Sequence, residues 1–434
     1  LCALVQTSLD AQPEWPRYRG PAGSGVAEGD GYADSWSTTK GVLWKADVPG
    51  TGWSSPVVVG DRVFVTSFVV PGKPGVPKIG FYLQPGTIPE GECRWVVHCF
   101  DFRTGKALWE KDALRSKPTW AIHPKNSYAA QTPSSDGERV FAFFGNVGLF
   151  CYDLDGKELW SWKCEPTRTR SDWGPGASPV LHKGRLYVVN DNEDRSYLAA
   201  LDAATGKELW KVARDEKTSW ATPFVWVTAD RVEIVTCATG KVRSYDTDGK
   251  LLWELGPMSD ICIPTPVAGE NLLYVSSGYE FGNKTRPIYA VRPGAKGDIS
   301  LKQGEASNEF VAWTQPSAGS YNPSPLLYGG RLYVLYSQGF LSCFDANTGK
   351  EIYTRERLGG TFSASPWAAD GKVFCLSETG DTSVIAAGDE FKILGKNRLN
   401  EVALATPATV RHALLVRTQS RLYRIERSAG EPKQ

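Results

Sequence analysis

Short runs of apolar residues, separated by tight turns, follow one another along nearly the whole chain. Segments such as GRLYVVN and GRLYVLY are alternating or apolar throughout, which is typical of β-strands buried on one or both faces. Nothing between these runs has the spacing of a long amphipathic helix. The pattern therefore predicts an all-β fold.

One strand–turn–strand element recurs, with Asp before the turn, Gly within it and an aromatic residue after it. FDFRTGKALW and LDAATGKELW are two clear copies. Asp accepts hydrogen bonds from the backbone that follows, and Gly supplies the positive φ that the turn needs. The terminal aromatic is best buried between neighbouring sheets. We expect this structural role for Trp44, Trp109, Trp160, Trp210, Trp253, Trp313 and Tyr353.

A second element precedes these copies and consists of small residues, a proline and an apolar run. It occurs eight times, at Pro56, Pro133, Pro179, Pro223, Pro266, Pro325, Pro366 and Pro407. Most copies lie about forty residues apart, which leaves room for four short strands in each unit. A four-stranded unit of this length cannot bury both its faces alone, so neighbours must stack into a ring. The repeats predict an eight-bladed β-propeller of four-stranded antiparallel blades.

The order of the elements indicates how the ring closes. The last unit, ending near Arg427, has only three strands, whereas residues 42–48 form an orphan strand with Trp44. We expect this N-terminal strand to complete the last blade and remove a free sheet edge. One propeller domain then spans residues 42–430, after a leader at 1–41. Insertions rich in Gly and Pro are expected at about 69–95 and 279–309.

The N-terminal residues LCALVQTSLDAQ run apolar and then polar, which resembles the end of a signal peptide with cleavage near Ala11. A frayed terminus without fixed structure is the alternative. With a signal peptide, the protein would be exported to the periplasm or cell envelope. No other stretch is long and apolar enough to span a membrane.

Charge and cysteine content narrow the function. Lys plus Arg number 49 and Asp plus Glu 48, so nothing favours a nucleic-acid partner. The nine cysteines include no CxxC pair and no metal-ligand spacing, and we expect no metal site. They fit buried free thiols, although a Cys93–Cys99 or Cys151–Cys164 disulfide is open for an exported protein.

The loops that precede the proline elements carry the candidate binding residues. In a propeller, loops from an outer strand to the next inner strand open on one face, around the central channel. Aromatic side chains with convergent polar groups at a channel mouth fit a ligand or peptide site. The candidates are Trp53, Trp120, His123, Lys125, Asn126, Arg170, Asp172, Trp173, Trp220, Asp260 and Tyr321. The alternative for each tryptophan is structural packing between blades. We assign no catalytic residue.

The LDAATGKELW form and its variants resemble the pyrroloquinoline-quinone-like β-propeller repeat family, over roughly residues 42–427. The family includes quinone-dependent alcohol and sugar dehydrogenases. It also includes a non-enzymatic propeller subunit of the bacterial outer-membrane β-barrel assembly machinery. Residues 15–29, WPRYRGPAGSGVAEG, are similar to a leader found in exported bacterial proteins of this type.

The resemblance leaves more than one function open. A quinone dehydrogenase needs Ca²⁺ ligands, an Asp base and cationic partners for the quinone; here Asp172 or Asp260 would face inward. The chain lacks the adjacent cysteine pair of the alcohol dehydrogenases and is shorter than them. We therefore favour a non-enzymatic, monomeric scaffold that binds a protein, peptide or envelope polymer without a cofactor. The alternatives are a pyrroloquinoline-quinone- and Ca²⁺-dependent oxidoreductase and a carbohydrate-binding propeller.

Overall fold

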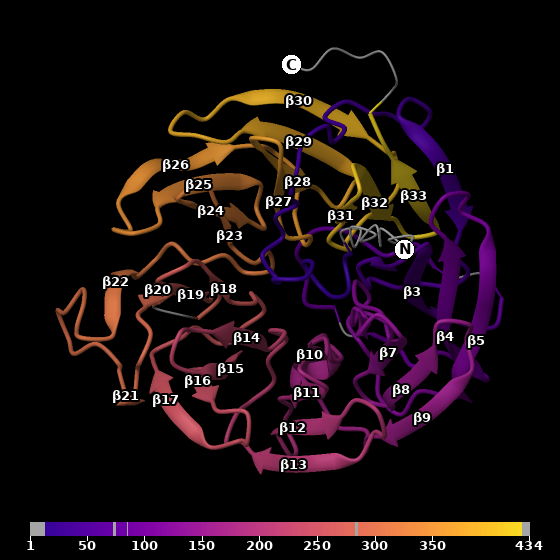
Figure 1. The fold of residues 1–434 in the computed structure, drawn as a ribbon, viewed down its shortest axis with the longest axis horizontal. Helices are drawn as coiled ribbons and strands as arrows, with labels where there is room; N and C mark the ends of the chain where they lie inside the picture. The colour runs from indigo at the N-terminus through magenta and orange to yellow at the C-terminus, as the bar shows by residue number, and fades with distance from the viewer. Residues whose placement is uncertain (1–13, 73–74, 85, 283–284, 428–434) are drawn as a thin grey trace, which may run out of the picture.

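The repeats form eight antiparallel sheets arranged as blades around a central axis, which confirms the eight-bladed propeller (Figure 1). The computed structural model describes residues 14–72, 75–84, 86–282 and 285–427. Within these ranges the only helical element is a 3-10 turn, η1 (Arg170–Asp172). The expected signal-peptide segment lies outside the described residues.

Each blade runs from an inner strand at the channel to an outer strand at the rim. The first four blades contain β2 (Val57–Val59), β3 (Arg62–Val69), β4 (Cys93–Asp101), β5 (Ala107–Ser116); β6 (Ser134–Ser135), β7 (Arg139–Phe144), β8 (Gly148–Asp153), β9 (Glu158–Lys163); β10 (Val180–His182), β11 (Arg185–Asn190), β12 (Tyr197–Asp202), β13 (Glu208–Ala213); and β14 (Phe224–Val227), β15 (Val232–Cys237), β16 (Val242–Tyr245), β17 (Leu251–Leu255). The last four contain β18 (Val267–Ala268), β19 (Leu273–Ser276), β20 (Ile288–Val291), β22 (Val311–Gln315); β23 (Leu326–Tyr328), β24 (Arg331–Tyr336), β25 (Phe340–Asp345), β26 (Glu351–Arg357); β27 (Trp367–Ala369), β28 (Lys372–Leu376), β29 (Asp381–Ala386), β30 (Ile393–Arg398); and β31 (Ala408–Val410), β32 (Ala413–Arg417), β33 (Arg421–Ile425) with β1 (Val42–Asp47).

The ring closes through the N-terminal strand, as the sequence predicts. Strand β1 pairs antiparallel with β33 and becomes the outer strand of the last blade, in the order β1-β33-β32-β31. The first and last strands of the propeller therefore share one sheet. Closure of this kind covers the edge of β33, and β1 takes the outer edge of the blade, as the outer strand does in the other blades.

Five recurrent tryptophans donate their indole N–H to the next blade: Trp44, Trp109, Trp160, Trp210 and Trp313. Trp253 differs from the expectation, because its Nε1 donates to Glu233 of its own blade at 2.6 Å. Trp44 Nε1 donates to the carbonyl oxygen of Phe102 at 2.9 Å, and Trp109 Nε1 donates to that of Leu154 at 3.0 Å. The acceptor in each case belongs to the Asp-containing turn of the following blade. Gly105 in such a turn has a positive φ, and a Cβ there would lie 2.5 Å from the Trp44 ring. Glycine thus serves both the turn and the tryptophan that packs on it.

The leader packs against the ring and crosses it (Figure 1). Trp15 exchanges two backbone hydrogen bonds with Val58 in the first blade. Buried Arg19 donates Nη2 to the carbonyl oxygen of Pro325 in the sixth blade, at 2.7 Å. These two blades lie on different sides of the channel, so the leader spans one end of it.

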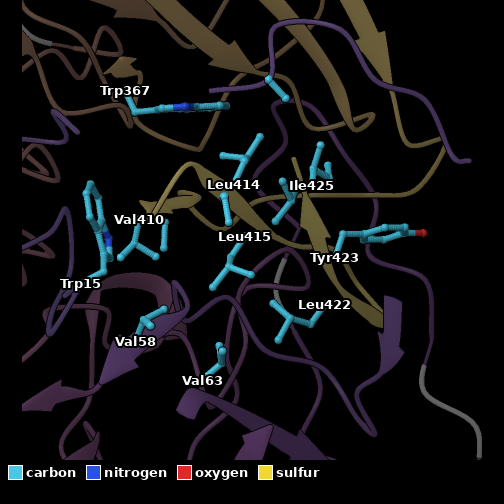
Figure 2. Packing of buried hydrophobic residues seen from close by; sticks show 14 of the residues in the cluster. Trp15, Val58, Val63, Trp367, Val410, Leu414, Leu415, Leu422, Tyr423 and Ile425 are labelled. Atoms are coloured by element: carbon cyan, nitrogen blue, oxygen red, sulfur yellow. The ribbon is translucent and has the colours of Figure 1, made fainter. Parts of the chain in front are cut away.

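Leader and ring share a hydrophobic cluster at the seam where the ring closes. Trp15, only 2% exposed, lies in this cluster with Val58 of the first blade and Leu415 of the last (Figure 2). Trp367 of the seventh blade completes it. Burial of this apolar surface stabilises both the leader and the closure of the ring.

The two longer connections have different structures. The first connection, 70–92, joins β3 to β4, and its described residues (70–72, 75–84 and 86–92) lie on the face where the outer-to-inner loops also lie. The second region divides into 277–287, whose described residues (277–282 and 285–287) lie on the same face, and residues 292–310 at the rim. Within the rim part, β21 (Gly297–Asp298) pairs in parallel with β17 of the preceding blade. A short fifth strand thus extends that neighbouring sheet.

The cysteines in the described part of the chain are all unpaired, so neither suggested disulfide is present. Cys93 and Cys99 lie on one strand, and Cys151 and Cys164 on β8 and just after β9. Burial raises the pKa of the Cys99 and Cys151 thiols to about 12, so they are protonated at neutral pH. Among the described elements, none is a helix of a length and apolarity suited to crossing a membrane.

Candidate functional site

The central channel contains a cavity of about 450 Å³. This volume falls within the range of about 300–1,000 Å³ that is typical of small-molecule sites. Tyr18 of the leader lines the cavity and hydrogen-bonds Ser365 through its hydroxyl group at 3.0 Å. At the other end, Phe81 and Leu83 of the 70–92 connection contribute to the wall. The leader therefore forms the floor, and the insertion narrows the mouth.

A ring of hydroxyl groups surrounds the channel because Ser or Thr precedes each of the eight repeat prolines. The backbone N–H of six of these residues donates to the hydroxyl oxygen of the counterpart in the next blade. Examples are Ser55 to Thr132 at 2.9 Å and Ser178 to Thr222 at 3.1 Å. The six links form two chains, one through Ser55, Thr132, Ser178 and Thr222 and the other through Thr265, Ser324, Ser365 and Thr406.

These hydroxyl groups hold the blades together and remain able to donate. Six of the ring residues line the cavity and are each at least nine-tenths buried: Ser55, Thr132, Ser178, Thr222, Thr265 and Thr406. Across the described ranges, none of the six donates its hydroxyl proton to a protein acceptor. Buried polar groups ordinarily find a partner, so these hydroxyl groups are suited to bind oxygen atoms within the channel.

Aromatic rings form the wall near the mouth. Trp173 and Trp220 lie with ring centroids 6.0 Å apart, and His123 meets Trp173 edge-on at 5.8 Å. The indole N–H groups are used elsewhere: Trp220 Nε1 donates to the carbonyl oxygen of Gly174 at 2.6 Å, and Trp53 Nε1 to that of Lys125 at 2.9 Å. Trp53 and Trp220 therefore offer carbon surface to the cavity, and their indole N–H groups are already bound.

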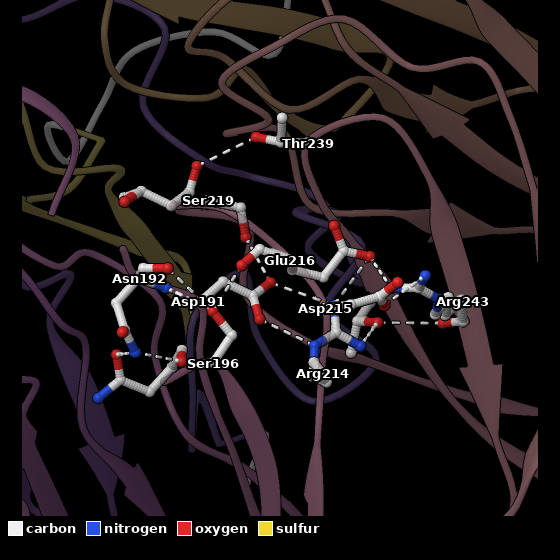
Figure 3. A network of polar contacts seen from close by, with 12 residues as sticks. Asp191, Asn192, Ser196, Arg214, Asp215, Glu216, Ser219, Thr239 and Arg243 are labelled. Atoms are coloured by element: carbon white, nitrogen blue, oxygen red, sulfur yellow. Dashed lines mark hydrogen bonds and ion pairs between the residues drawn. The ribbon is translucent and has the colours of Figure 1, made fainter. Parts of the chain in front are cut away.

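A buried polar network holds the loop that carries Trp220 (Figure 3). Arg214 binds Asp191 through two nitrogens, at 2.8 and 3.1 Å, and both side chains are fully buried. Ser219, next to Trp220, donates its hydroxyl to the same carboxylate at 2.8 Å. Arg243 pairs with Glu216 in the same loop. Paired buried charges of this kind fix a loop in one conformation, so Trp220 rests on a rigid support.

A second charged cluster lies at the mouth and ties the insertion to the ring. Lys125 Nζ lies 2.5 Å from Glu378 Oε1 and donates to the carbonyl oxygen of Gly80 at 3.1 Å. Glu378, only 1% exposed in its side chain, accepts the Gly80 N–H at 2.7 Å. Lys125 and Glu378 come from the second and seventh blades. Gly80 is thus fastened between loops from two distant blades.

His123 is neutral at pH 7 in this setting. Burial lowers its pKa, and the nearby charge of Lys125 lowers it further, against the opposing effect of its hydrogen bond to Tyr82. Its Nδ1 accepts the backbone N–H of Lys125 at 3.1 Å. The ring therefore helps to shape the mouth without adding a charge.

The structure brings seven of the eleven candidate residues into the cavity wall: Trp53, His123, Lys125, Asn126, Trp173, Trp220 and Tyr321. Four candidates do not line it: Trp120, Arg170, Asp172 and Asp260. Arg170 and Asp260 form an ion pair beside the channel at 3.4 Å. Asp172 lies in the 3-10 turn η1 with a positive φ.

Sequence reasoning missed several residues of the cavity. Tyr18 comes from the leader, whereas Tyr82 and Tyr279 come from the two long connections, outside the repeated pattern. Glu378 lies in the turn between β28 and β29, where the sequence predicts exposure to solvent, but Gly80 of the 70–92 connection binds its carboxylate there. The sequence did carry a signal for the hydroxyl ring. Ser or Thr precedes every repeat proline, whereas a requirement for small size alone would also admit Gly or Ala.

The cavity wall does not offer the donor set of a quinone–calcium centre. In the described part of the chain, Lys125 is its single charged lining residue, and that charge is matched by Glu378. Among the described lining residues there is no carboxylate, whereas Ca²⁺ prefers several carboxylate and carbonyl oxygens. Nor does a group of three His, Cys, Asp or Glu residues suited to a metal occur elsewhere in the described ranges. The residues present therefore do not fit such a cofactor.

Comparison with known proteins identifies a family and several partial relatives. A family model described as outer membrane protein assembly factor BamB matches residues 94–280 and 295–390. Polyvinylalcohol dehydrogenase from a Pseudomonas species is 27% identical over 41% of the chain and 25% of that protein. BamB from Shewanella oneidensis is 24% identical over 53% of the chain and 57% of that protein. The matches thus span less than two thirds of either relative.

Solved structures of other proteins support the propeller fold. BamB from Moraxella catarrhalis superimposes with a TM-score of 0.58 and 10% identity, over 90% of this chain and 99% of that one. A europium-containing methanol dehydrogenase superimposes with a TM-score of 0.58 and 13% identity, over 94% of this chain and 90% of that one. At these identities the likeness extends to the fold alone.

Proposed function

We propose a function for this chain on the premise that it belongs to the propeller family described as outer membrane protein assembly factor BamB. The chain acts as a non-enzymatic scaffold in the cell envelope. It binds a protein partner through the face around the channel mouth. The partner presents an extended segment with apolar side chains, as a strand of an outer-membrane protein would.

The observation that carries this proposal is an apolar surface on the two long connections at the mouth. Five large apolar side chains there are exposed: Val76 by 76%, Phe81 by 41%, Leu83 by 67%, Ile88 by 38% and Phe281 by 60%. Exposed apolar groups that gather in this way mark interaction sites, whereas single ones are ordinary. Leu209 on the outer strand β13 is an example of the ordinary kind.

An aromatic row joins the two connections into one surface. Phe81 lies 6.4 Å from Tyr321, Tyr321 lies 5.2 Å from Tyr279, and Tyr279 lies 5.6 Å from Phe281, measured between ring centroids. Aromatic residues dominate the energetics of protein interfaces. Phe81 and Phe281 therefore present exposed rings to a partner, and the buried Tyr279 and part-buried Tyr321 pack between them. The Lys125–Glu378 pair holds one side in place.

A peptide-binding measurement tests the proposal. The probe is a fluorescently labelled peptide with alternating apolar and polar residues, and the control peptide carries Ser at each apolar position. We expect micromolar affinity for the first and none for the second. The double variant Val76→Asp, Ile88→Asp should weaken binding at least about tenfold, which corresponds to about 1.4 kcal/mol.

Leu209→Asp is the matched control, because it places the same charge on an equally exposed apolar site at the rim. It should leave the affinity unchanged. Equal affinities for the double variant and the native chain would contradict the proposal. So would binding of peptidoglycan or lipopolysaccharide fragments at this face in place of the peptide.

The same proposal excludes a quinone-dependent dehydrogenase activity. A cofactor that binds the folded chain raises its melting temperature by mass action. We expect no shift on addition of pyrroloquinoline quinone with Ca²⁺, because the wall lacks the required carboxylates. Dye-linked oxidation of an alcohol or sugar by the mixture would overturn this part of the proposal.

A further inference from the structure

The cavity beneath the mouth is chemically distinct from the apolar surface above it. Its walls combine tryptophan faces with buried hydroxyl groups, and its single lysine is neutralised by Glu378. We propose that the channel is a separate binding site for a neutral saccharide, either a monosaccharide or a disaccharide. The apolar mouth surface and this site take different ligands, although Phe81, Leu83 and Phe281 border both.

Two tryptophans form an aromatic wall on one side of the cavity. A sugar ring has one face of C–H groups that packs on an indole, and its edges carry hydroxyl groups. Trp173 and Trp220 lie together on one side of the cavity, and their spacing of 6.0 Å with an angle of 39° makes a concave apolar surface. The N–H of Trp220 is held by Gly174, so the indole is fixed in its position.

The hydroxyl ring provides hydrogen-bond donors. Thr132, Ser178 and Thr222 stand in neighbouring blades below the tryptophans, and the oxygen of each already accepts a backbone N–H. The proton of each hydroxyl is therefore the group left to use, and none is donated to a protein atom in the described ranges. Each residue is at least 93% buried, so bulk water cannot easily serve in its place. Sugar oxygens are suitable acceptors.

The wall, over its described residues, offers no usable charge. Within the described lining, Lys125 is the single charged residue, and it lies 2.5 Å from a Glu378 oxygen. A phosphate, nucleotide or polycarboxylate would enter without an unpaired cation to compensate it, at high desolvation cost. A neutral ligand with many oxygens has no such cost. Asn322 adds a side-chain amide to the wall.

The experiment titrates the full chain with glucose, galactose, mannose, N-acetylglucosamine, maltose, cellobiose and lactose. Calorimetry and tryptophan fluorescence follow binding up to about 10 mM sugar, which detects dissociation constants into the millimolar range. We expect at least one sugar to bind and to change the fluorescence of the wall tryptophans. Choline, glycine betaine and inorganic phosphate are titrated in parallel.

Matched variants place the sugar in the channel. Trp220→Ala should weaken binding at least about tenfold, whereas Trp162→Ala, which removes a half-buried tryptophan of the outer strand β9, should not. Thr222→Ser keeps a hydroxyl group and should bind as the native chain does. Thr222→Val should lose about tenfold in affinity. Unchanged circular dichroism and melting behaviour of the Ser variant keep this comparison valid if Trp220→Ala folds poorly.

Several results would overturn the inference. One is no binding of any neutral sugar in the panel at the highest concentration. Another is binding of choline, betaine or phosphate alone. A third is equal loss of affinity in Trp220→Ala and Trp162→Ala. Because Val76→Asp with Ile88→Asp alters the mouth surface and not the wall, sugar binding should survive that double variant, and failure of one proposal leaves the other standing.

Discussion

The link between Glu378, Lys125 and Gly80 makes a specific prediction about stability. The two carboxylate oxygens of Glu378 have four donor partners: Lys125 Nζ at 2.5 Å, Ser363 Oγ at 2.6 Å, the Gly80 N–H at 2.7 Å and Thr361 Oγ1 at 3.0 Å. Glu378→Gln replaces one oxygen by an amino group. That group must then face either the lysine or the Gly80 N–H, and both are donors.

The magnitude follows from burial. Loss of one partner from a buried ion pair costs about 3–5 kcal/mol. The Lys125 side chain retains 13% exposure, so water can partly solvate it. We therefore expect Glu378→Gln to lower the free energy of unfolding by about 2–4 kcal/mol. The 70–92 connection should also loosen, because its anchor at Gly80 is lost.

Urea denaturation gives the stability change, and limited trypsin digestion gives the local effect through cleavage after exposed Lys78. The single variants Lys125→Met and Glu378→Leu, with their double variant, form a double-mutant cycle. The double variant should cost less than the sum of the single changes, because no buried charge is left unpaired. A Glu378→Gln cost below about 0.5 kcal/mol with unchanged cleavage would refute the reasoning.

Further predictions concern the core and the ring. Burial holds the pKa of His98 at about 3, far below the 6.5 of an exposed histidine. Between these two pH values the unfolded chain binds more protons than the folded chain. The free energy of unfolding therefore falls as the pH drops below 6.5. Urea midpoints at pH 7 and 5 should show a loss of stability that is about 2 kcal/mol larger in the native chain than in His98→Gln. Equal losses in both would contradict it. Trp160→Ala should lower the free energy of unfolding in urea by about 2 kcal/mol, because Trp160 packs on the next blade. The control Leu159→Ala, at the exposed neighbouring residue, should lower it by less than about 0.5 kcal/mol. Equal costs would show that the contact between blades is unimportant. Trp15→Ala should cost about 3–5 kcal/mol because this leader residue is buried in the closing seam, and an unchanged melting temperature would show the leader to be a loose appendage.

The fold was accessible from the sequence because its signal is local and repeated. Each Asp–Gly turn and each Ser/Thr-Pro strand start is specified within about ten residues, and the repeats require them to stack. The closure also had a local signal, since Trp44 ends a strand with no blade of its own before it. The loop tryptophans Trp53, Trp173 and Trp220 could be placed at the channel because outer-to-inner loops converge on the axis.

The remainder of the site depends on contacts between distant segments. Tyr18 reaches the channel because its leader crosses the ring, and no repeat specifies that path. Glu378 is buried by an insertion that begins some three hundred positions earlier in the chain. Trp120 shares the loop of His123 and Lys125, yet it does not line the cavity. Loop composition therefore identified the face, while the orientation of single side chains required the tertiary structure.

Hydrogen–deuterium exchange with and without the alternating peptide tests the central claim most directly. The account predicts slower exchange in residues 75–84, 86–92 and 277–282 around the mouth, with the outer strands β9 and β13 unchanged. The double variant Val76→Asp, Ile88→Asp should lose this protection under the same conditions. Protection confined to the rim, or none at saturating peptide, would contradict the claim that the channel mouth is the binding face.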